Sequence, residues 1–151
     1  MRKIFRVLSL AVLIALCGAV PLASCSSKNN PVSDSESDYK INFFLKDQKV
    51  AVLGLTDLHR LSNVTLQMAG KNETGVTLPS VLELAGISNY SEVQIKGMLK
   101  GRLATGQLTL KLGDITNEVL LSYNNQGKTK LCGTKIPDSN WIIDVAEIRA
   151  Q

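Results

Sequence analysis

Cysteine and histidine, the residues that most often build metal and redox sites, are scarce in this chain. Its 151 residues include three cysteines and one histidine. Cys17 and Cys25 fall near the N-terminus, so Cys132 is the one cysteine in the remainder of the chain. A single histidine and a single thiol cannot form a Cys/His zinc site, a Cys-x-x-Cys redox pair or an internal disulfide in that remainder.

Aromatic residues and excess charge are also too sparse for a nucleic-acid binder. Aromatic residues make up 5% of the chain and are too scattered to form a stacking platform. The formal net charge is +4, but Arg2, Lys3 and Arg6 lie in the first six residues. Without these three the chain has 14 basic and 13 acidic residues, which gives no long-range attraction for polyanions. We expect no nucleic-acid partner.

The N-terminal residues have the order of a secretory signal. The basic start precedes an apolar run over residues 7–20, and small residues follow. At about 1.5 Å per residue, this run is only about 21 Å long, shorter than the roughly 30 Å hydrocarbon core of a bilayer. The stretch Leu22-Ala23-Ser24-Cys25 resembles the lipobox of bacterial lipoproteins. The resemblance implies that residues 1–24 are removed and that Cys25 carries lipid, which makes the membrane a partner.

The lipoprotein resemblance also implies a location. It places the mature chain outside the cytoplasm, and Ser26, where an aspartate favours inner-membrane retention, implies the outer membrane in a Gram-negative host. Residues 26–38 have one apolar side chain, Val32, so this segment cannot bury enough surface to become ordered. We expect residues 25–38 to form a flexible tether with a reach of about 20 Å. A single domain over residues 39–151 follows.

Alternating and blockwise apolar residues begin at Tyr39 and predict a mainly β, α+β domain. Thr56 is the expected cap of a first short helix, and Thr77, Pro79 and Gly86 bound a second. The expected strands cover residues 41–45, 50–53, 64–68, 93–95, 108–112, 120–123, 128–132 and 141–148; the expected helices cover 56–61, 77–85 and 114–119; a polar loop covers 69–75; and a glycine-rich, basic segment covers 96–106.

The stretch VTLQMAGKNETGVTLPSVLELAGI, residues 64–87, resembles the sulfite oxidase family, in which a strand ends in VTLQCAGN before a loop and a helix ending in Ala-Gly-Val or Ala-Gly-Ile. The Asn-Gln-Gly-Lys turn and the closing segment Trp-Ile-Ile-Asp-Val-Ala-Glu-Ile also resemble that family's later strands. The resemblance spans residues 40–151 and implies the molybdopterin-binding fold of these oxidoreductases.

The departures from this family bear on function. The resemblance places the molybdenum-binding cysteine of VTLQCAGN at Met68, whose thioether is a weak ligand for a metal that takes an anionic thiolate. Lys71 precedes Asn72, and Glu73 replaces the arginine that commonly follows the asparagine. The family's Gly-Pro-Leu-Arg segment before the last strand is replaced by residues 132–137. We therefore expect no cofactor, with molybdopterin as the alternative.

Several residues are candidates for a ligand pocket, each with a plainer interpretation. Met68 continues the apolar face of its strand, and Cys132 is either a substitute thiolate or a small packed side chain. A glycine-spaced basic segment either cradles an anionic group or is simply solvated. The candidate pocket residues are Met68, Lys71, Asn72, Lys96, Lys100, Arg102 and Cys132. We identify no catalytic or metal-binding residues.

Three hypotheses remain open from the sequence. The leading one is a lipid-anchored, extracytoplasmic binding or interaction module, without catalysis, that binds an unidentified protein or a small anionic ligand. The second is a molybdopterin-dependent oxidoreductase with an unconventional metal ligand. The third is a structural lipoprotein of the cell envelope. A fold alone does not choose among them.

Overall fold

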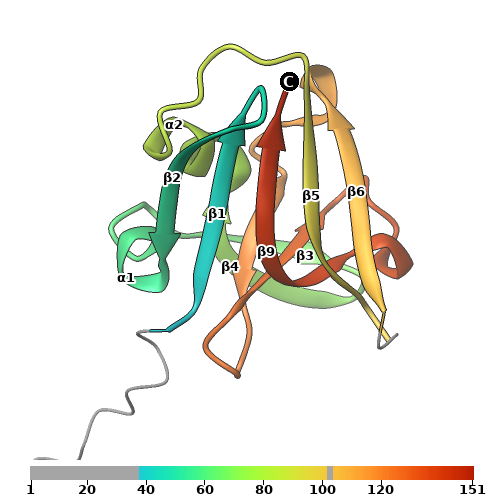
Figure 1. The fold of residues 1–151 in the computed structure, drawn as a ribbon. Coiled ribbons are helices and arrows are strands. Elements are labelled where there is room, and N and C mark those ends of the chain that lie inside the picture. The colour runs from blue at the N-terminus through green and yellow to red at the C-terminus, as the bar shows by residue number, and fades with distance from the viewer. Residues whose placement is uncertain (1–37, 102–103) are drawn as a thin grey trace, which may run out of the picture. The chain divides into compact units, whose positions relative to one another are not determined.

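The computed structural model describes residues 38–101 and 104–151, a range dominated by β-strands (Figure 1). The predicted leader, the tether, Cys25 and Arg102 lie outside these described residues. The prediction of a mainly β, α+β domain is confirmed. The strands are β1 (Lys40–Leu45), β2 (Gln48–Gly54), β3 (Val64–Met68), β4 (Lys71–Thr77), β5 (Glu92–Leu99), β6 (Thr105–Lys111), β7 (Val119–Tyr123), β8 (Thr129–Gly133) and β9 (Ile142–Ala150); the helices are α1 (Leu55–Leu58), α2 (Leu78–Leu84) and the 3-10 helices η2 (Leu112–Asp114) and η3 (Asp138–Asn140).

Strand β9 belongs to two layers of sheet. Its C-terminal half lies parallel to β1 and antiparallel to β5, in the strand order β6-β5-β9-β1-β2 that faces the viewer in Figure 1. Its first residues, Ile142 and Ile143, also pair with β5, and on their other side they pair with β8, which begins the order β8-β7-β4-β3. Between the two halves Asp144 has a φ of 52°, and the β5 partner shifts register between Lys96 and Met98. This bulge bends β9 from one layer into the other.

Short turns connect the hairpins that the sequence predicted. Lys46 and Asp47 join β1 to β2 with φ values of 47° and 66°, the left-handed conformation that matches the twist of a two-residue hairpin. The hairpin of β7 and β8 is also confirmed, and its turn is closed by Asn124, whose side-chain oxygen accepts from the backbone nitrogens of Gln126 and Lys128.

The prediction of a polar loop over residues 69–75 is wrong, because most of these residues form a strand. Ala69 and Gly70, both with positive φ, form a two-residue turn, and the chain returns at once as β4. Its N-terminal part pairs with β3 and its last three residues also pair with β7. The sequence looked like a loop because the exposed Lys71, Asn72 and Thr74 are polar residues on a strand near the surface.

Two of the predicted α-helices form, but the first, predicted over residues 56–61, ends at Leu58 and has a different cap. The Thr77 hydroxyl accepts from the Ser80 nitrogen at the start of α2, and Gly86, with a φ of 76°, follows its end. In α1 the cap is Gly54, whose backbone nitrogen donates to the Asp57 carboxylate at 3.0 Å, and not Thr56. None of the helices in the described ranges is long and apolar enough to cross a membrane.

The helix predicted over residues 114–119 is absent from the structure. The 3-10 helix η2 ends at Asp114, and turns lead from it directly into β7. Ile115 and Val119 are both buried and four residues apart, which imitates the spacing of a helix face. Val119, however, is the first residue of strand β7, so the two residues are not on one helix face.

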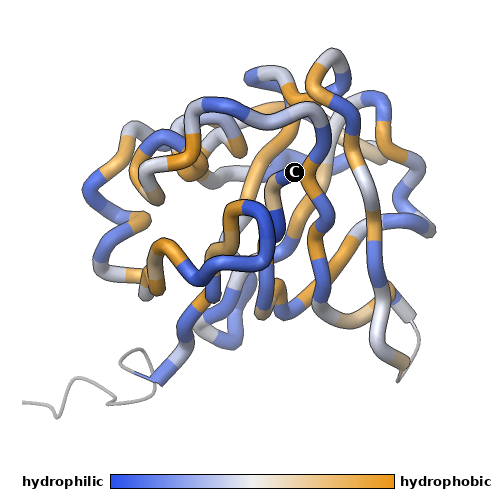
Figure 2. The backbone as a smooth tube through the Cα atoms, turned by 45° about the horizontal axis from the view of Figure 1, so that its top comes forward, coloured by the Kyte–Doolittle hydropathy of each residue, from blue (hydrophilic) through white to orange (hydrophobic). Residues whose placement is uncertain are grey.

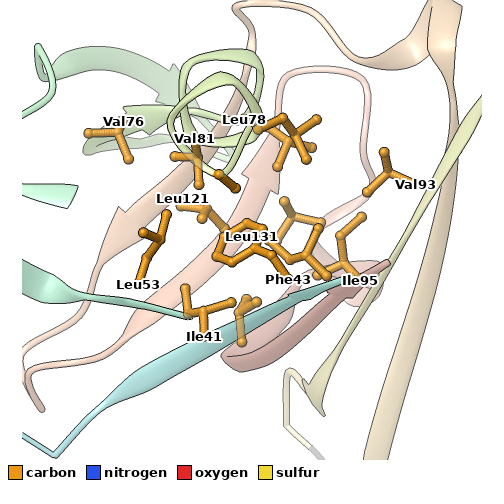
Figure 3. Packing of buried hydrophobic residues seen from close by; sticks show 14 of the residues in the cluster. Ile41, Phe43, Leu53, Val76, Leu78, Val81, Val93, Ile95, Leu121 and Leu131 are labelled. Atoms are coloured by element: carbon orange, nitrogen blue, oxygen red, sulfur yellow. The ribbon is translucent and has the colours of Figure 1, made fainter. Parts of the chain in front are cut away.

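The main hydrophobic core fills the space between the two layers and beneath α2. Phe43, Ile95 and Leu131 are fully buried, and Leu78 and Val81 of α2 point toward them (Figure 3). Hydrophobic and hydrophilic residues alternate along the strands, most clearly along β5 (Figure 2). This period of two places one face of each strand in the core.

Candidate functional site

A second, smaller apolar cluster lies on the other face of β7 and β8. Strand alternation places Leu121 in the main core and its neighbour Leu120 on the opposite face, beside its cross-strand partner Cys132. Met68, at the end of β3, and Trp141, just before β9, complete this cluster. The fold therefore brings together Met68 and Cys132, two of the residues that the sequence marked as candidates.

The tight contact between β4 and β7 depends on a glycine. A Cβ atom at Gly75 would lie 2.1 Å from the Leu121 carbonyl oxygen, which is backbone and cannot move aside. Gly75 pairs with Val64 on one side and with Ser122 on the other. Glycine at this position therefore lets the backbones of β4 and β7 lie this close together.

The thioether of Met68 is a packed side chain in this structure. Met68 is only 4% exposed, and Leu120, Cys132 and Trp141 surround it in the cluster. Met68 pairs with Lys71 across the hairpin, but the side chains of Lys71 and Asn72 are exposed. The cluster therefore does not include these two candidates.

The thiol of Cys132 is fully buried and protonated at neutral pH. Burial, helped by the negative charge of nearby Glu73, raises the pKa of Cys132 to about 12. The Cys132 sulfur lies 3.9 Å from the Leu120 carbonyl oxygen, to which the thiol donates. A thiolate is the form that attacks or binds metals, so this sulfur is chemically inert as it stands.

A buried ion pair covers one side of the cluster. The Glu73 side chain is 11% exposed; its Oε1 lies 2.7 Å from Lys130 Nζ, and its Oε2 accepts from the Ser122 hydroxyl at 2.7 Å. Burial raises the pKa of Glu73, but the hydrogen bonds from Lys130 and Ser122 outweigh burial, so the pKa lies below its ordinary value. Sequence reasoning missed this role because it placed Glu73 in a loop; on a strand, Glu73 shares a face with Gly75 and Ser122.

Trp141 links this ion pair to a second one. Lys130 Nζ lies 5.0 Å and Lys100 Nζ 4.7 Å from the centre of the indole ring, both within cation–π range. Lys100 also pairs with Asp138 at 3.0 Å, and this contact lowers the pKa of Asp138. The indole nitrogen donates to the Ile136 carbonyl oxygen at 3.1 Å. The polar residues around Trp141 are therefore paired with one another.

Lys96 and Lys100, the two described residues of the predicted basic cradle, each pair with a different carboxylate. Lys96 lies on the front sheet, where its ammonium pairs with Glu147 at 3.0 Å, while Lys100 is bound to Asp138. The fold requires glycine at position 97, because a Cβ atom there would lie 2.6 Å from the Ile143 carbonyl oxygen at the bulge of β9. Within the glycine-rich, basic segment over residues 96–106, residues 96–99 belong to β5 and residues 105–106 belong to β6.

A cleft of about 270 Å³ lies next to the cluster. It is lined by Leu108 and Leu110 of β6, by Val119, and by residues 134–137 of the connection from β8 to β9. Ile136 lines the cleft and also packs against the cluster of Met68 and Cys132. Sequence reasoning did not foresee this cleft, which long-range packing creates.

A second cleft, of about 390 Å³, lies where the domain begins, beside Tyr39. The Tyr39 hydroxyl lies 2.7 Å from the Thr129 hydroxyl and donates to the Val145 carbonyl oxygen. Lys128 pairs with Asp144 at 2.9 Å along the same cleft. These contacts fix the first residue of the domain to β8 and β9.

The fold defines a class: a mainly β domain with a molybdopterin-binding-like, sulfite oxidase-like architecture. Among solved structures the chain is similar to the sulfane dehydrogenase SoxCD from Paracoccus pantotrophus, with a TM-score of 0.59 and 14% sequence identity. The match covers 76% of this chain and 38% of that chain, so this protein spans well under half the length of its structural neighbour. No known family model matches the sequence. No curated protein matches it either.

The residues of this chain do not fit the cofactor that such a fold implies. Met68, at the position that the family resemblance gives to the metal ligand, is buried in an apolar cluster. The nearby sulfur of Cys132 is held as a thiol beside the negative charge of Glu73, which opposes its ionisation. Lys96 and Lys100 already neutralise carboxylates. We therefore derive no chemistry through a molybdenum centre.

Proposed function

We propose that this protein is a lipid-anchored binding or interaction module outside the cytoplasm, without catalytic activity, on a molybdopterin-binding-like fold. The observation that carries the proposal is the closed cluster of Met68, Cys132 and Trp141, which offers no thiolate and no open metal position. The ion pair of Glu73 and Lys130 completes this closure, since both charges are used internally. The surface of the domain and the clefts beside Ile136 and Tyr39 are then the parts available for binding.

One observation favours a second candidate, a molybdopterin-dependent oxidoreductase with an unconventional ligand. Cys132 belongs to the same cluster as Met68, so a sulfur that could ionise in contact with a metal lies close to the expected position. Its burial and the adjacent carboxylate weigh against this candidate.

Metal analysis distinguishes the two candidates. The full chain and a Cys132→Ser variant are produced in a host that makes molybdenum cofactor, and molybdenum and pterin are measured after denaturation. We expect well below one molybdenum per chain in both proteins, because neither sulfur is available as a thiolate. Near-stoichiometric molybdenum in the parent protein, lost in Cys132→Ser, would overturn the proposal and identify Cys132 as the ligand.

The anchor is tested separately. We expect Cys25→Ala to move the protein from the membrane fraction to the soluble fraction, because the lipid is attached to that sulfur. Cys17→Ala is the matched control, since it removes a cysteine from the apolar run and leaves the lipobox intact. Membrane attachment of Cys25→Ala equal to that of the parent protein would refute lipid anchoring at this residue.

A further inference from the structure

Strand β6 forms an unprotected edge of the front sheet. Within residues 38–101 and 104–151 it pairs with β5 alone, so the backbone groups on its other side have no strand partner (Figure 1). Its sequence, TGQLTLK, has no proline, and its one charged residue, Lys111, is at the end. Its register with β5 runs without a bulge. Proline, inward-pointing charge and bulges are three of the features that keep an edge from pairing, and β6 has none of these three.

The 270 Å³ cleft lies directly beside this edge. Leu108 and Leu110 of β6 form one wall, while Val119 and Ile136 contribute to the rest of the lining. Its volume is below the range of about 300–1,000 Å³ typical of small-molecule and cofactor sites. A cleft of this size suits one or two apolar side chains better than a whole cofactor.

The rim of the cleft adds charge and a further apolar contact. Asp114 and Glu118 face one basic residue, Lys135, so the rim has an excess of negative charge. Glu118 accepts from the Thr134 hydroxyl at 2.6 Å, which fixes the far wall. Leu112, which follows β6 immediately, is 55% exposed and extends the apolar surface beyond the cleft.

The other two edges of the described sheet differ from β6. Strands β2 and β3 end the strand orders on their sides, but neither contributes a residue to this cleft. The apolar residues of β3, Val64, Leu66 and Met68, pack into the small cluster. At β6, an open edge, a cleft with apolar walls from Leu108, Leu110 and Ile136, and an acidic rim occur together.

We propose that β6 and this cleft bind an extended segment of a partner protein. The segment adds to the sheet as a further strand, inserts an apolar side chain between Leu110 and Ile136, and directs a basic side chain toward Asp114 and Glu118. Main-chain hydrogen bonds supply the affinity in this mode of recognition, and the cleft and rim supply the selectivity. This inference rests on the proposed function, because it names the kind of partner that the binding module takes.

The test uses the purified full chain in detergent and a displayed library of random short peptides. We expect the selected peptides to alternate apolar and polar residues and to contain lysine or arginine. A synthetic peptide from the selection should slow amide hydrogen exchange in residues 105–111. N-methylation of one alternating set of its amides should abolish binding, whereas methylation of the other set should leave binding intact, because an edge strand uses every second amide.

Two variants with the same change of charge serve as test and control. We expect Asp114→Lys, at the rim, to weaken the peptide by about tenfold, and Glu83→Lys, on the exposed side of α2, to leave the affinity unchanged. A library that yields no binder, or binders that protect β2 or β3 and not β6, would overturn the inference. Neither result would refute the proposed function if the metal analysis finds no molybdenum. Failure of the strand-binding inference and failure of the proposed function can therefore be distinguished.

Discussion

Replacing Trp141 with alanine is expected to lower the free energy of unfolding by about 3–5 kcal/mol, the range for truncating a buried aromatic residue. Trp141 is 3% exposed and closes the small cluster over Met68 and Cys132. Its loss leaves a cavity and removes the ring on which Lys100 and Lys130 lie. Urea denaturation followed by far-ultraviolet circular dichroism measures the effect without depending on the tryptophan signal.

The variant Trp141→Phe distinguishes the contribution of the aromatic ring to stability from that of the indole hydrogen bond. Phenylalanine keeps an aromatic face for the two lysines but cannot donate to the Ile136 carbonyl oxygen. We expect a smaller loss, about 1–2 kcal/mol, from the missing hydrogen bond and the smaller ring. If Trp141→Ala costs less than about 1 kcal/mol, the cluster is not the packed unit described above.

Removing Lys130 is expected to cost about 3 kcal/mol, because Lys130→Ala leaves the Glu73 carboxylate largely buried without its cationic partner. The double variant Glu73→Leu/Lys130→Met should recover much of that loss, since apolar side chains of similar size replace both charges. Lys128→Ala is the matched control: its ion pair with Asp144 involves a lysine that is 41% exposed, so we expect a cost below about 1 kcal/mol. Equal losses for Lys130→Ala and Lys128→Ala would contradict a special role for the Glu73 pair.

The same ion pair makes stability depend on pH in a defined direction. The pKa of Glu73 in the folded chain lies below its ordinary value of 4.5, so the folded state binds the proton less readily than the unfolded state. The contribution of Glu73 is therefore complete above about pH 4.5 and is lost as the pH falls through the folded pKa. Glu73→Gln should show a shallower acid loss of stability than the parent protein in denaturation curves over that range.

Local sequence signals predicted the elements whose structure depends on near neighbours. The hairpin of β1 and β2, the helix α2 with Thr77, Pro79 and Gly86, and the turn closed by Asn124 all depend on residues a few positions apart. Local signals failed for β4, because its polar residues resemble a loop unless the partners β3 and β7 are known. They failed for residues 114–119 because Ile115 and Val119, two buried residues at helical spacing, lie just after η2 and in β7 respectively.

The candidate site could be predicted only in part for the same reason. The sequence singled out Met68 and Cys132, but not that both belong to one cluster with Trp141. The ion pair of Glu73 and Lys130 joins residues from β4 and β8, which are not neighbours in the sheet, and no local pattern connects them. The cleft depends on where β6 ends relative to the connection between β8 and β9. Such contacts follow from the topology and not from the spacing of residues along the chain.

The attachment of Tyr39 has a mechanical consequence. If the domain is anchored through the residues before 38, as proposed above, tension enters the fold at Tyr39 and passes directly into β1. That strand lies between β2 and β9, with hydrogen bonds to both, and a pull along its axis loads those bonds in shear. Hydrogen bonds loaded in shear share the force and break together. When a hairpin is peeled from its end, the bonds break one after another. The contacts of the Tyr39 hydroxyl with Thr129 and Val145 connect this first residue to β8 and β9, so a pull on the N-terminal end acts on these two strands as well as on β1.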